Sequence, residues 1–82
     1  MEDRIIVVFK INRADKGMDI EIPLGITAEE LIYGLNEGLH LGIDVDDPVR
    51  SYMRCENPIA LIRGEVTVEE LGLHSGSVIY MT

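Results

Sequence analysis

The chain has 82 residues, 46% hydrophobic and 27% charged, a balance typical of one small folded domain spanning residues 1–82. Fifteen acidic and seven basic residues give a net charge of −8, which argues against nucleic acid as a partner, because clustered Lys and Arg bind phosphate backbones. A single cysteine excludes an internal disulfide. No apolar run approaches the roughly 20 residues of a membrane span, and the first residues lack the pattern of a secretory signal. We therefore expect a cytosolic domain that does not insert into membranes.

Residues 4–12 predict a strand with one strongly apolar face, because every odd position from Ile5 to Ile11 is apolar. On the opposite face only Ile6 and Val8 are apolar. A turn containing Gly17 follows, and residues 18–22 then alternate between apolar and acidic side chains. The first 23 residues are therefore expected to form a β-hairpin.

A capping box at Thr27 and Glu30 predicts the start of an amphipathic helix. Apolar residues at positions 28, 31, 32, 35 and 39 form one stripe, which indicates a helix of about 12 residues. Gly42 stands where a C-terminal cap is expected. The helix should therefore pack its stripe against a sheet.

The second half of the chain predicts three further strands and a short helical turn. Residues 49–56 and 59–63 read as strands, with Met53 and Cys55 pointing inward. A second capping box at Thr67 and Glu70 precedes the helical turn, and residues 78–81 form the last strand. This order favours an α+β fold in which one long helix packs on one face of a mixed five-stranded sheet and the last strand lies parallel to the first in the centre. Such a layout is the β-grasp, or ubiquitin-like, fold.

Three acidic residues form the densest carboxylate cluster, at Asp44, Asp46 and Asp47. Hard cations such as calcium bind oxygen ligands. The EF-hand spacing fails, however, because Val49 and Cys55 stand where that motif requires glycine and glutamate. The sequence favours a solvated acidic loop and predicts no metal site.

No residue pattern indicates catalysis or a cofactor. Cys55 has no CxxC partner and is expected to be a buried, inert thiol, and His40 and His74 share no ligand spacing. Ser75 and Ser77 flank a glycine without the order of a nucleophile elbow. We therefore predict that the chain is not an enzyme and binds no cofactor.

Apolar side chains on the outer face of the sheet are the clearest functional signal. If the odd positions of the first strand face the helix, several apolar and aromatic residues must gather on the other side of the sheet. Contiguous patches of this kind mark protein-interaction sites, and tyrosine is frequent at their centres. The predicted interaction residues are Ile6, Val8, Tyr52, Ile62, Val78 and Tyr80. Scattered apolar residues on an open sheet are the plainer explanation, and homodimerisation would use the same residues.

Several segments resemble the YukD family, also called YukD/EsaB-like, of bacterial ubiquitin-like proteins. The similar segments are residues 22–32, 35–43, 56–64, 67–73 and 75–80. They consist of caps, turns and strands and contain no chemical motif, so the resemblance concerns fold and family and transfers no catalytic or ligand residue.

The resemblance implies an accessory component of a type VII (WXG-protein, ESAT-6-like) secretion system, found chiefly in Gram-positive bacteria. Such a protein would be non-catalytic and cytosolic, and it would act by protein–protein interaction, recruited to membrane components at the cytosolic face of the apparatus.

Two other functions compete with this one. A ubiquitin-type modifier or sulfur carrier needs a flexible tail ending in Gly-Gly, whereas this sequence ends Tyr80-Met81-Thr82, so that function is disfavoured. A regulatory subunit of another bacterial multicomponent complex is the third reading, because one fold serves many functions.

Overall fold

The computed structural model describes residues 3–47 and 49–81. Its elements are β1 (Arg4–Lys10), β2 (Met18–Pro23), α1 (Ala28–Leu39), β3 (Met53–Glu56), β4 (Ala60–Ile62), α2 (Val68–Leu71) and β5 (Val78–Tyr80). Within the described residues, neither helix has the length and apolar character that crossing a bilayer requires.

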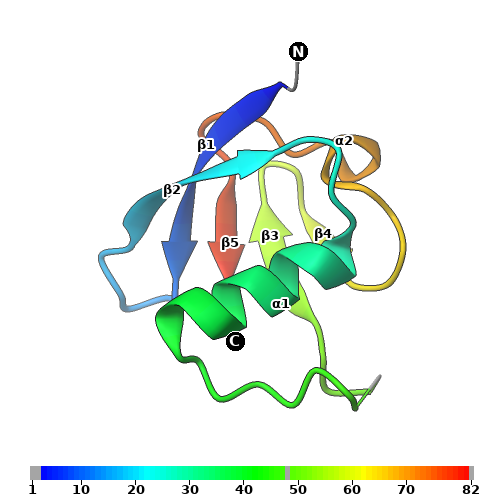
Figure 1. Cartoon of the computed structure of the whole chain (residues 1–82). Helices are drawn as coiled ribbons and strands as arrows, with labels where there is room; N and C mark the ends of the chain where they lie inside the picture. The colour runs from blue at the N-terminus through cyan, green and yellow to red at the C-terminus, as the bar shows by residue number, and fades with distance from the viewer. Residues whose placement is uncertain (1–2, 48, 82) are drawn as a thin grey trace.

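The strands form one mixed sheet in the order β2-β1-β5-β3-β4, with α1 lying across one of its faces (Figure 1). β1 and β5 pair in parallel, whereas the β1–β2, β3–β5 and β3–β4 pairs are antiparallel. The predicted α+β class, the five strands and the parallel pairing of the first and last strands are confirmed. The third strand is shorter than predicted, because pairing begins only at Met53.

The first helix begins where its capping box predicts. The Thr27 hydroxyl accepts a hydrogen bond from the Glu30 amide at 3.1 Å, and the Glu30 carboxylate accepts one from the Thr27 amide at 2.9 Å. Thr67 and Glu70 form the same reciprocal pair at the start of α2. These bonds satisfy backbone donors that have no partner inside the helix, and so they fix where each helix starts.

The predicted C-terminal cap at Gly42 is wrong. α1 ends at Leu39 and is capped by His40, whose backbone is left-handed with φ 54° and whose amide donates to the Asn36 carbonyl. The Asn36 side chain also accepts from the Ile43 amide at 2.8 Å and donates to the Ile43 carbonyl at 3.0 Å. The chain is thus bound back onto the helix end, which places the cap two residues before the glycine.

The core lies between α1 and the inner face of the sheet. Val7 and Phe9 of β1 are 1% and 2% exposed, as the alternation predicts. Ile11 was predicted on the same face but is 40% exposed, because β1 ends at Lys10 and the chain turns away. The remaining buried apolar residues are Ile22, Ala28, Leu31, Ile32, Leu35, Met53, Cys55, Ile62, Val68, Leu73 and Ile79.

Candidate interaction face

The sheet face opposite α1 carries the residues that are out of phase with the core. Strand pairing aligns Lys10, Tyr80, Arg54 and Leu61 in one row across β1, β5, β3 and β4. A second row contains Asp19, Val8, Val78 and Glu56. Ile6 lies two residues before Val8 and pairs with Glu21. We call this surface the open face and define it by these residues: Ile6, Val8, Lys10, Asp19, Glu21, Arg54, Glu56, Leu61, Val78 and Tyr80.

The apolar part of the open face lies over β1 and β5. Ile6 is 52% exposed, and it lies beside the half-buried, directly paired Val8 and Val78. Gly17 packs against this part, since a Cβ there would lie 2.6 Å from Cγ1 of Val8 and its backbone has φ +87°. The placement on the outer side of the sheet that the sequence predicts for Ile6, Val8 and Val78 is therefore observed.

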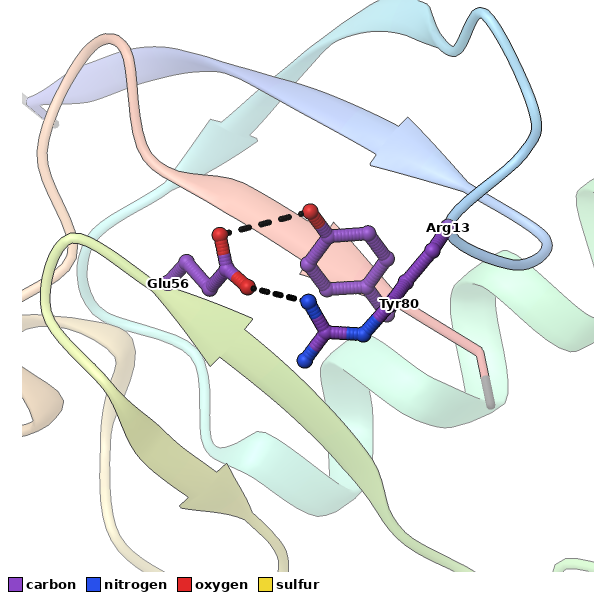
Figure 2. Close-up of polar contacts among 3 residues, drawn as sticks. All are labelled: Arg13, Glu56 and Tyr80. Carbon is purple, nitrogen blue, oxygen red and sulfur yellow. Dashed lines mark hydrogen bonds and ion pairs between the residues drawn. The ribbon is translucent and has the colours of Figure 1, made fainter.

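Tyr80 also lies on the open face, but its ring is covered and only 8% of the residue is exposed. The Arg13 guanidinium lies 5.5 Å from the ring centroid and the Lys10 ammonium 5.9 Å. The Glu56 carboxylate accepts hydrogen bonds from Arg13 at 3.1 Å and from the Tyr80 hydroxyl at 3.4 Å (Figure 2). The Tyr80 ring therefore makes cation–π contacts with two side chains and does not form an exposed aromatic surface.

One predicted interaction residue, Ile62, lies elsewhere, whereas Tyr52 lies near the open-face residue Arg54. Ile62 is 0% exposed and pairs with Met53 in the core, so its predicted place on the outer face is wrong. Its neighbour Leu61, 45% exposed and paired with Arg54, occupies the open face instead. Tyr52 lies just before β3, half-buried, and lines a second hollow that includes the open-face residue Arg54 together with Ile43, Arg50 and Met81, among others.

A shallow hollow of about 370 Å³ lies at the β4 side of the open face. Its walls are residues of the loop after β1 and of strands β3, β4 and β5 together with the turn before β4: Arg13, Arg54, Cys55, Glu56, Ile59, Ala60, Leu61 and Tyr80. Ile59 is 89% exposed at its edge. The hollow therefore combines aliphatic side chains with cations.

The potentially nucleophilic side chains of Cys55 and Ser77 are buried and hydrogen-bonded to the backbone. Cys55 is 2% exposed, and its thiol donates to the Ala60 carbonyl at 3.6 Å. Burial raises the pKa of the Cys55 thiol above its usual value, and this favours the neutral thiol over the nucleophilic thiolate. Ser77 is fully buried and donates to the Asn57 carbonyl at 2.6 Å, a structural bond that joins β5 to the turn between β3 and β4.

The acidic loop uses its carboxylates to organise its own backbone. Asp44 accepts a hydrogen bond from the Asp46 amide at 3.1 Å, and Asp47 accepts one from the Val49 amide at 3.0 Å. Across residues 3–47 and 49–81, no group of three or more His, Cys, Asp or Glu is arranged to hold a metal ion. His40 forms the helix end, and a ring nitrogen of His74 lies 2.9 Å from the Ser75 carbonyl oxygen.

Comparison of the sequence with protein-family models and with curated proteins finds no match.

Proposed function

We propose that the chain is a β-grasp, ubiquitin-like domain of the YukD/EsaB-like family. The strand order, with β1 and β5 parallel in the centre and α1 across one face, supports the β-grasp assignment. The resemblance of the capping, turn and strand segments supports the family. The corresponding function is that of a non-catalytic accessory component of a bacterial type VII secretion system, acting by protein–protein interaction.

The observation that supports this proposal most strongly is the apolar part of the open face. Ile6 is half exposed next to Val8 on the same strand and Val78 on the adjacent strand. Burying the remaining exposed part of such a side chain would contribute about 1 kcal/mol to binding. A partner that covers Ile6, Val8 and Val78 together would gain several times that amount before the costs of association.

The proposed partner is a membrane-associated protein of the secretion machinery, contacted at its cytosolic side. The chain would be recruited through this protein contact, without inserting into the bilayer or binding nucleic acid. Its net charge of −8 would speed encounter with basic regions of the machinery, because complementary charge chiefly raises association rates.

Affinity capture from detergent-solubilised membranes of the source bacterium tests the proposal. Tyr33 on α1 provides a matched control for Ile6, because the two residues are 53% and 52% exposed on opposite sides of the molecule. We expect the tagged wild type and the Tyr33→Asp variant to recover membrane components of the secretion system, and the Ile6→Asp variant to recover at least about tenfold less, since the charge would be buried in the interface.

Two results would contradict the proposal. Equal recovery by Ile6→Asp and Tyr33→Asp would exclude the apolar part of the open face as the binding surface, and failure of the wild type to recover any secretion component would exclude the functional assignment. Circular dichroism spectra of both variants check that the fold is retained.

A further inference from the structure

Positive charge gathers around Tyr80 on the open face, whereas the β2 side of the same face is acidic, because Glu21 and Asp19 pair with Ile6 and Val8. Lys10, Arg13 and Arg54 surround Tyr80, either beside it in the strand register or over its ring. Among the described residues, the only carboxylate lining the hollow is that of Glu56, and it already accepts hydrogen bonds from Arg13 and Tyr80. Within the described part of the chain Arg54 forms no ion pair. The hollow beside Tyr80 is therefore complementary to negative charge, although the chain as a whole is acidic.

Exposed aliphatic side chains border the same cations. Ile59 and Leu61, 89% and 45% exposed, line the hollow together with Arg54 and Arg13. A ligand that fills the hollow would contact aliphatic carbon and a guanidinium group at once. A purely ionic or a purely apolar ligand would satisfy only one part of the hollow.

The hollow adjoins an uncovered sheet edge. β4 is the last strand in the order, and in the described chain no loop backbone hydrogen bond reaches Ala60, Leu61 or Ile62. An edge strand of this kind offers backbone hydrogen bonds to an extended peptide. The edge is only three residues long, so side-chain contacts in the hollow must supply the selectivity.

We infer that this hollow binds an extended segment of a partner protein in which aliphatic side chains are flanked by carboxylates. The aliphatic groups would pack on Ile59 and Leu61, and a carboxylate would accept charge-assisted hydrogen bonds from the unpaired Arg54. The inference rests on the proposed function, which supplies the identity of the partner. The inference adds the kind of segment that this partner would present.

Titration of the purified protein with a peptide that has blocked termini tests the inference. The peptide carries a central run of valines flanked by glutamates. A peptide with lysines in place of the glutamates is the control ligand. Arg63→Glu is the matched control variant for Arg54→Glu, because Arg63 is exposed but lines a different hollow, beside Glu29 and Asp46. Both variants change the charge equally.

We expect Arg54→Glu to weaken binding of the glutamate peptide by at least about tenfold and Arg63→Glu by less than about threefold. In NMR spectra of the wild type, the amides of Ile59 and Leu61 should shift on titration. Equal weakening by the two variants, tighter binding of the lysine peptide, or no binding of the glutamate peptide would overturn the inference.

The outcome is separable from that of the capture experiment. Loss of peptide binding alongside intact recovery of secretion components would refute the peptide chemistry and leave the proposed function standing. If the wild type binds the peptide but recovers no secretion component, the proposed function would be refuted and the peptide chemistry would stand.

Discussion

Replacement of Phe9 by alanine is expected to lower the free energy of unfolding by about 3–5 kcal/mol, the range for a buried phenylalanine. Phe9 is the single phenylalanine of the chain and is 2% exposed on the inner face of β1. It pairs with Ile79 of β5 and Met18 of β2, so its side chain lies at the centre of the sheet under α1. A domain of this size is stable by about 4–12 kcal/mol in total. The substitution should therefore leave a marginally folded protein.

Urea denaturation followed by circular dichroism measures this loss. Ile59→Ala is the control, because Ile59 is 89% exposed and its truncation should change stability by less than about 0.5 kcal/mol. A cost below about 1 kcal/mol for Phe9→Ala would mean that the core is not packed as described.

Replacement of Ser77 by alanine should cost about 2–3 kcal/mol, a large loss for removing one oxygen atom. The Ser77 hydroxyl is fully buried, donates to the Asn57 carbonyl at 2.6 Å and accepts from the His74 amide at 3.0 Å. Alanine would leave both of those backbone groups without this partner in a place with little access to water. The desolvation penalty of each group, rather than the mean value of a hydrogen bond, sets the cost.

Ser75→Ala separates this effect from the loss of any serine in the turn. The Ser75 hydroxyl accepts from the Ile6 amide at 3.2 Å, but it is exposed, so water can replace it. We expect Ser75→Ala to cost less than about 1 kcal/mol in the same denaturation experiment. Equal costs for the two serines would refute the structural role assigned to Ser77.

Local signals allowed most of the fold to be predicted from the sequence. The start of α1 follows from the reciprocal bonds between Thr27 and Glu30, whose residue types and spacing are those of a capping box. The inward placement of Val7 and Phe9 follows from strict alternation along β1. Both signals depend on residues only a few positions apart, and tertiary structure has little freedom to override them.

The errors arose where local signals permit more than one answer. Leu61 and Ile62 are adjacent aliphatic residues in a strand of three, so alternation alone does not show which of them points inward. The pairing of Ile62 with Met53 decides it. The helix end could be placed at Gly42 because glycine favours a left-handed backbone, but the bonds from Asn36 to Ile43 turn the chain earlier.

The polar framework of the candidate site depends on contacts that sequence patterns do not contain. Arg13 and Glu56 are 43 positions apart, yet they meet over Tyr80. The sequence placed Tyr80 on the outer face but gave no indication that Arg13, from a surface turn, covers it. The cations around Tyr80 are brought together by the pairing of β1, β3 and β5, which local sequence patterns do not contain.

Secretion itself tests the central claim most directly. In a strain of the source bacterium that lacks this protein, export of a WXG protein into the medium should be lost, and expression of the wild type or of Tyr33→Asp should restore it. The Ile6→Asp variant, expressed at the same level, should not. Full export in the strain without the protein, or full restoration by Ile6→Asp, would contradict the claim that the open face connects this domain to the secretion machinery.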